Sequence, residues 1–190
     1  MTTTLTTMPV VRRLAPAMLA VMLVPAGLLA GCGSGKKTGA APATWAKSVC
    51  TALTPWRTKI TTLTDEAQAQ LTSTTTPADA QRNLVGLLGG AETASETARQ
   101  KVADAGTPDV DRGDEIAAGF VASLRTARDA YAHAREAVAG LDPAEASPFY
   151  TAVAGAFDKL QHEYAASALD TDRLSSEPLR KAFNEVSECH

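Results

Sequence analysis

The sequence predicts an all-α fold, an antiparallel helical bundle of four long helices followed by a short C-terminal helix. Apolar residues recur at steps of three and four through most of the chain, which is the spacing of one face of an α-helix. Alanine supplies 32 of the 159 residues from position 32 onward, and this favours closely packed helices over sheets. The predicted connections are about 4–10 residues long, as expected between antiparallel neighbours.

The first helix is predicted to start near Trp45 and to end near Leu71. Its apolar face is formed by Trp45, Val49, Leu53, Trp56, Ile60, Leu63, Ala67 and Leu71. Pro55 interrupts this pattern, and proline lacks the N–H that an interior helical position needs. Two outcomes are therefore open: a kinked helix, or a break after which Thr54 caps a new helix. Residues 72–76 are polar and predict a turn.

The second helix has a well-marked start. Thr76 supplies a capping hydroxyl, Pro77 suits the first helical position, and Asp79 places an acid in the first turn. The expected apolar face comprises Ala80, Leu84, Leu87, Ala91, Ala94, Ala98 and Val102. Gly89 and Gly90 lie in its middle, where each costs about 1 kcal/mol relative to alanine. They either allow a neighbouring element to approach closely or mark a bend.

Three further helices complete the expected bundle. The third is predicted within residues 111–140 and ends at Gly140, with an apolar face of Ile116, Phe120, Leu124, Ala127, Tyr131, Ala134, Val138 and then Leu141. The fourth opens at Ser147-Pro148 and presents Phe149, Val153, Phe157, Leu160 and Tyr164. The short fifth helix starts at Ser175 or Ser176 and presents Leu179, Phe183 and Val186.

The first 31 residues have the organisation of an export signal. A polar stretch ends in Arg12-Arg13, an apolar segment covers residues 14–28, and small residues follow. The apolar segment is shorter than the ~20 residues of a membrane-spanning helix and contains Pro16 and Pro25. We therefore expect it to be removed rather than retained as an anchor. Arg12-Arg13 leaves open whether export uses the general secretory or the twin-arginine route.

Leu29-Ala30-Gly31-Cys32, at the end of that segment, resembles the lipobox of bacterial lipoproteins. The resemblance implies that the Cys32 thiol carries a diacylglycerol group, with palmitate among the acyl chains, and that cleavage before Cys32 removes residues 1–31. Two acyl chains hold a protein stably on a bilayer. The expected location is the extracytoplasmic face of the cell membrane, anchored by the lipid. The alternative is an ordinary signal peptide that ends in this tetrapeptide by chance.

Residues 33–44, GSGKKTGAAPAT, have the composition of a flexible linker. The predicted organisation is thus a signal peptide at 1–31, a lipidated N-terminus with its tether at 32–44, and a helical bundle domain at 45–190. Lys36 and Lys37 either contact anionic lipid headgroups or remain solvated.

Two of the three cysteines remain once Cys32 is acylated. Cys50 lies near the start of the first helix, and Cys189 is the penultimate residue. Outside the cytoplasm such a pair can form a stable disulfide, which we predict here. The alternative is two separate buried thiols.

The sequence offers no convincing catalytic or metal-binding constellation, and we expect no cofactor, no catalytic residue and no metal ligand. Asp129 and His133, like Asp158 and His162, are four residues apart on predicted helices. Facing pairs of this kind could hold a metal, but the helical phase turns them toward solvent and favours surface ion pairs. His190 is expected to be disordered at the chain end. The common hydrolase, zinc-protease and phosphate-loop motifs are absent from the sequence.

Composition narrows the function only to a class. From position 32 the chain has 16 basic and 21 acidic residues, so it lacks the positive charge expected of a nucleic-acid-binding protein. With Trp45, Cys50, Trp56 and a cysteine at the C-terminal end, the body resembles small helical lipoproteins of actinobacteria, a group without a common activity. We expect a non-catalytic interaction or structural module of the cell envelope that meets an unknown envelope protein. The alternative is a carrier that binds a small apolar ligand or a metal between helices. An internal apolar cavity would favour the carrier, and an exposed apolar patch would favour the interaction module.

Overall fold

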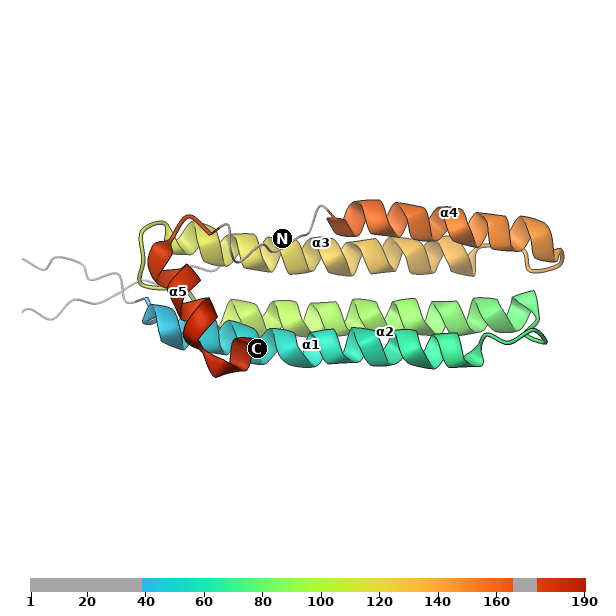
Figure 1. Ribbon diagram of the computed structural model, residues 1–190. Helices are drawn as coiled ribbons and strands as arrows, with labels where there is room; N and C mark the ends of the chain where they lie inside the picture. The colour runs from blue at the N-terminus through green and yellow to red at the C-terminus, as the bar shows by residue number, and fades with distance from the viewer. Residues whose placement is uncertain (1–38, 166–173) are drawn as a thin grey trace, which may run out of the picture. The chain divides into compact units, whose positions relative to one another are not determined.

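The computed structural model describes residues 39–165 and 174–190, and these residues form helices without strands (Figure 1). The elements are α1 (Pro42–Gln70), α2 (Pro77–Asp104), α3 (Gly113–Ala139), α4 (Ala146–Ala165), α5 (Glu177–Glu185) and the short 3-10 helix η2 (Ser187–Cys189). The prediction of four long helices and a short C-terminal helix is confirmed.

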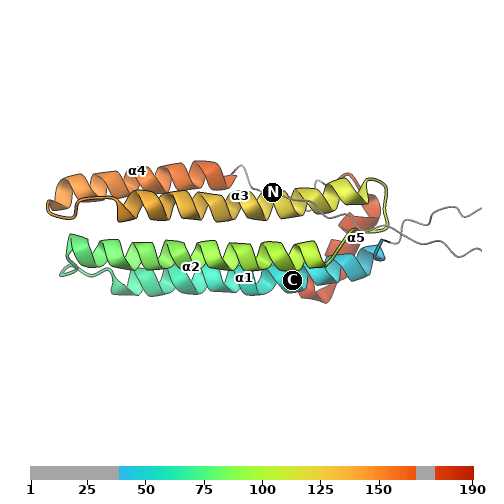
Figure 2. The same cartoon turned by 180° about the vertical axis from the view of Figure 1, so that it is seen from behind.

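The long helices pack in chain order. The α2–α3 pair has the most extensive interface, α1 packs on α2, and α4 packs on α3 (Figures 1 and 2). No pairing of comparable extent joins α1 to α4 in the described part of the chain. Helix α5 and η2 return the chain to α1. The bundle is therefore built on a central α2–α3 pair with α1 and α4 as its outer helices.

Helix α1 begins before the predicted domain boundary at Trp45. Helix α1 starts at Pro42, a residue suited to the first turn because its missing N–H would be unpaired there in any case. Ala40 already pairs with the loop after α2: its N–H donates to the Thr107 carbonyl at 2.8 Å, and its carbonyl accepts from the Asp109 N–H at 2.7 Å. The predicted tether at 32–44 is therefore too long at its C-terminal end.

Helix α1 continues through Pro55 without a break, so Thr54 does not cap a second helix. The Thr54 hydroxyl instead donates to the Glu188 carbonyl at 3.3 Å. Packing along both halves of α1 holds the helix together despite the proline.

Two other boundaries rest on local chemistry. The Thr76 hydroxyl accepts from the Asp79 N–H at 3.2 Å, which confirms the predicted cap of α2. Before α3, Arg112 has a left-handed backbone with φ of 54°. Gly113 follows because a Cβ there would lie 2.1 Å from the Pro108 carbonyl oxygen.

One part of the core surrounds three aromatic rings at the end of the bundle where α5 docks. The Trp45 ring lies edge-on to Phe120 and Phe183, with centroids 5.2 and 6.0 Å away, and the two phenylalanines stack at 5.8 Å. The buried Trp45 Nε1–H donates to the Gly106 carbonyl at 2.9 Å. A second cluster joins α2, α3 and α4 around Leu88, Tyr131 and Leu160.

The observed buried face of α2 differs from the predicted one. Leu88 and Ser95 are buried, whereas the predicted core residues Leu87 and Ala94 are only half-buried. A spacing of three or four residues fits either choice, and the position of α3 selects between them. On α3, likewise, Ala117 is buried where Ile116 was expected.

Burial falls off in the outer helices. On α1, Trp56, Ile60 and Leu63 are half-buried and Leu71 is 42% exposed, although all four were predicted core positions. On α4, only Phe149 and Leu160 are buried, and the rest of the predicted apolar face is half-buried. This follows from the arrangement, because the outer helices each have one extensive long-helix partner.

Candidate functional site

The predicted lipid attachment at Cys32, the preceding lipobox residues and Arg12-Arg13 lie outside the described residues. None of the described helices combines the length and the apolar composition that a membrane-spanning helix requires.

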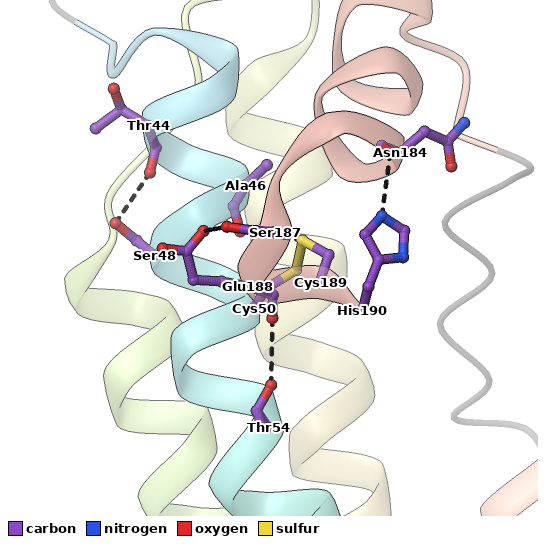
Figure 3. Close-up of a disulfide and its surroundings, with 10 residues drawn as sticks. All are labelled: Thr44, Ala46, Ser48, Cys50, Thr54, Asn184, Ser187, Glu188, Cys189 and His190. Atoms are coloured by element: carbon purple, nitrogen blue, oxygen red, sulfur yellow. Dashed lines mark hydrogen bonds between the residues drawn. A yellow bond between two sulfur atoms is a disulfide. The ribbon is translucent and has the colours of Figure 1, made fainter.

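A disulfide joins Cys50 to Cys189, with an S–S distance of 2.07 Å and a Cα–Cα distance of 5.0 Å (Figure 3). This confirms the predicted bridge and excludes two separate thiols. Glu188 reinforces the junction, because its carboxylate lies 2.7 Å from Lys47 Nζ. The neighbouring ammonium group lowers the pKa of Glu188 below its ordinary value. The C-terminal residues are thus attached to α1 by a covalent bond, an ion pair and the hydrogen bond from Thr54.

The expectation that His190 is disordered is wrong. Its backbone N–H donates to the Ser187 carbonyl at 3.3 Å, and its Nε2 lies 3.1 Å from the Asn184 carbonyl oxygen (Figure 3). The nearby disulfide explains this order, because it fixes the preceding residue to α1.

The predicted Asp129–His133 pair does not form. His133 Nδ1 lies instead 3.0 Å from Glu163 Oε2 on α4, while Asp129 accepts from the adjacent Arg128. This contact connects α3 with α4, and the hydrogen bond to His133 lowers the pKa of the Glu163 carboxyl. No hydrogen bond or ion pair joins Asp158 to His162 in the described chain. The described residues also contain no group of three or more His, Cys, Asp or Glu side chains that could hold a metal.

A charged network links α2 with α3. Glu96 accepts from Arg99 at 2.6 Å on its own helix and from Arg128 at 2.8 Å on α3. The two guanidinium groups hold the pKa of the Glu96 carboxyl far below its ordinary value. Farther along the same interface, Arg135 donates to Glu92 at 2.9 Å. Each of the two carboxylates, Glu92 and Glu96, faces at least one arginine, so the network stabilises the α2–α3 interface.

A groove of about 510 Å³ lies between α1 and α2, and we call it the α1–α2 groove. It is lined by Ala52, Pro55, Trp56, Lys59, Gly89, Gly90, Thr93, Ala94, Thr97, Ala98 and Lys101. The lining is largely apolar and contains no carboxylate. The groove is open to solvent and is not an enclosed cavity.

Close approach of α1 to α2 shapes this groove. The Trp56 Nε1–H donates to the buried Ser95 hydroxyl at 3.0 Å, and that hydroxyl donates to the Ala91 carbonyl at 2.8 Å. A Cβ on Gly90 would lie 2.8 Å from Leu63 Cδ1. Of the two roles considered for the glycine pair, Gly90 therefore serves the close approach of a neighbour, and α2 runs through it as one helix.

No pattern in the sequence predicts this groove. Its two walls come from helices whose lining residues are about 30–50 positions apart, so no local spacing reveals it. One sequence feature does bear on the groove. Small residues recur along α2 at Gly90, Ala94 and Thr97, and their side chains are too small to fill the space beside a neighbouring helix.

No protein-family model, no curated protein and no solved structure matches this chain.

Proposed function

We propose that this chain is a lipid-anchored, extracytoplasmic helical protein of the cell envelope that acts as a non-catalytic interaction module. The observation that carries the proposal is the α1–α2 groove, an apolar surface that is open to solvent and lies on the outside of the bundle. Exposed apolar surface of this kind is typical of protein interaction sites.

The state of the polar groups supports a binding role. Every buried side-chain nitrogen or oxygen atom of the described residues has a hydrogen-bond partner. Catalytic groups, by contrast, are commonly held with perturbed pKa values in a cleft. The groove's ionisable residues, Lys59 and Lys101, are both exposed, and no carboxylate lines the groove beside them.

The lipobox resemblance of Leu29–Cys32 supports the membrane anchor. A short tether confines the domain near the bilayer and raises its effective concentration for partners there. A small interface such as this groove then suffices for binding, because the anchor keeps the domain close to partners at the membrane.

Site-specific photo-crosslinking in cells that naturally produce the protein would test this function. A photoreactive residue is introduced singly at exposed positions on different helices, such as Thr97 on α2, Arg125 on α3 and Lys159 on α4. We expect at least one position to yield a reproducible adduct with an envelope protein. We also expect Cys32→Ala to weaken that adduct, because the anchor is lost. Failure of every position to capture a protein would refute the interaction role.

The groove volume also supports a second candidate, a carrier of a small apolar ligand. About 510 Å³ falls within the ~300–1,000 Å³ typical of small-molecule sites. Organic extraction of protein purified without detergent, followed by mass spectrometry, separates the candidates. A stoichiometric apolar compound that is absent from a Trp56→Asp variant would establish the carrier.

A further inference from the structure

We propose that the α1–α2 groove docks one amphipathic helix of a partner protein, about three turns long, with carboxylates at both ends of its apolar face. This inference rests on the proposed interaction role and adds the class of partner and the surface that binds it.

The groove has the length of a short helix. Contacts of Trp56 with Ser95 and of Leu63 with Gly90 show that α1 and α2 run antiparallel in a fixed register. Along α2 the lining extends from Gly89 to Lys101, which at 1.5 Å per residue is ~18 Å. A docked helix would present about 12 residues over that length.

The polar groups in the groove are satisfied within the protein and leave apolar surface for a partner. The Thr93 and Thr97 hydroxyls donate to the carbonyls of Gly89 and Thr93, at 2.9 and 3.0 Å, as part of α2 itself. The Trp56 N–H is likewise satisfied by Ser95. The threonine methyl groups and the indole ring therefore remain available for apolar contact with an occupant.

Charge complementarity identifies the ends of the partner helix. By the register above, Lys59 lies level with about residue 92, so it and Lys101 are separated by ~14 Å along the groove. Neither lysine forms an ion pair with a described residue, whereas Arg99 and Arg128 both contact a carboxylate. Two cations on opposite walls of the groove, unpaired among the described residues, suit carboxylates about nine residues apart, because at 100° per residue these lie on opposite flanks of a docked helix.

The openness of the groove favours a helix over an acyl chain. The groove covers one side of its occupant and leaves the other side in water. An acyl chain is apolar on all sides, so its outer half would stay hydrated at a cost. An amphipathic helix needs to bury only one face, and its polar face remains in solvent. The small, half-buried Ala94 in the groove floor also permits a helix backbone to approach closely.

The test uses the full-length, membrane-anchored protein in its natural host. A photoreactive residue is placed at Thr93 or Thr97, both exposed and in the lining of the groove, and at the exposed Arg125 of α3 as the control position. Crosslinked peptides are then mapped by mass spectrometry. We expect the groove positions to capture one protein segment with a helical apolar repeat and acidic residues about nine positions apart.

Charge reversal provides the second part of the test. Lys59→Glu together with Lys101→Glu should reduce the groove adduct by about tenfold, because two attractions become repulsions. Arg125→Glu reverses an unpaired cation outside the groove and should leave the adduct nearly unchanged. Circular dichroism of each variant checks that the helices remain intact.

A synthetic peptide of the captured segment then allows a direct measurement. Its binding should change the fluorescence of Trp56 and should weaken with added salt. In a Trp56→Phe variant, the remaining Trp45 is buried away from the groove and should report no change.

Several outcomes would overturn the inference. These are an adduct with a lipid or with a second copy of this chain, a captured segment that is basic or not helical, and an adduct insensitive to the double lysine variant. Capture of a partner from Arg125 alone would also contradict the docking groove while leaving the interaction role intact. Absence of protein adducts at every position would refute both proposals.

Discussion

Removal of the Cys50–Cys189 disulfide by a double serine substitution should lower stability substantially without unfolding the protein. The bridge closes 139 residues, nearly the whole described domain, into one covalent loop. Loop-closure entropy for such a length gives a maximum loss of about 5 kcal/mol in the free energy of unfolding. For a domain of this size, that corresponds to a melting temperature lower by about 10–20 °C.

The fold should survive because α5 does not depend on the bridge alone. Leu179, Ala182 and Phe183 are buried, and Phe183 packs against the Trp45 and Phe120 rings. Helicity at low temperature should therefore match that of the wild type.

Thermal and urea unfolding, followed by circular dichroism in a Cys32→Ser background, would measure the effect. Protein that retains Cys50 and Cys189 but is chemically reduced is the matched control, and its melting temperature should equal that of the serine variant. A melting temperature within about 2 °C of the oxidised protein would refute the loop-closure argument. Loss of helicity at low temperature would instead show that apolar contacts cannot hold α5.

Three further predictions concern the anchor, the charged network and the glycine pair. Cys32→Ala should yield protein without acyl chains, and an unmodified Cys32 in membrane-bound wild type, by intact mass, would refute the lipid anchor. Because its arginine partners lower the pKa of Glu96, the ionised carboxylate stabilises the folded state at pH values above the ordinary carboxyl pKa of 4.5. This contribution is lost as the pH falls below that value. Glu96→Gln should therefore flatten the decline in melting temperature between pH 5 and 2, and an unchanged slope would contradict this. Gly90→Val should destabilise by about 1–3 kcal/mol in urea because it crowds Leu63, whereas Gly86→Ala, which points into open space, should be neutral or stabilising.

Local rules in the sequence were sufficient for the helices and for the disulfide. The cap at Thr76, the apolar period of α3 and the glycine at position 140 each act over a few residues, so they could be recognised without a partner. The cysteine pair was predictable because only two cysteines remain once Cys32 is set aside as the proposed site of lipid attachment. The sequence could not decide whether the helix breaks at Pro55. The cost of an interior proline competes with packing along the whole of α1, and only the folded structure reveals that packing.

The candidate site depends on registers that the sequence does not contain. Whether Leu87 or Leu88 faces the core changes the phase of α2 by about 100°, and therefore decides which small residues line the outer surface. The partner of His133 likewise depends on where α4 lies along α3. Both features require the relative positions of two helices, so spacing within one helix could not predict them.

The covalent loop also determines how the domain would carry mechanical load. Cys189, near the C-terminal end of the domain, is bonded to Cys50 of α1, which lies only 11 residues after the first described residue, Gly39. A force applied between an anchor at the N-terminal end and a partner holding His190 would pass through residues 39–50, the disulfide and the last residue. Residues 51–188 lie inside the loop and would bear no tension along the chain. Such a protein could transmit tension between the membrane and a bound structure while its helical bundle stays folded.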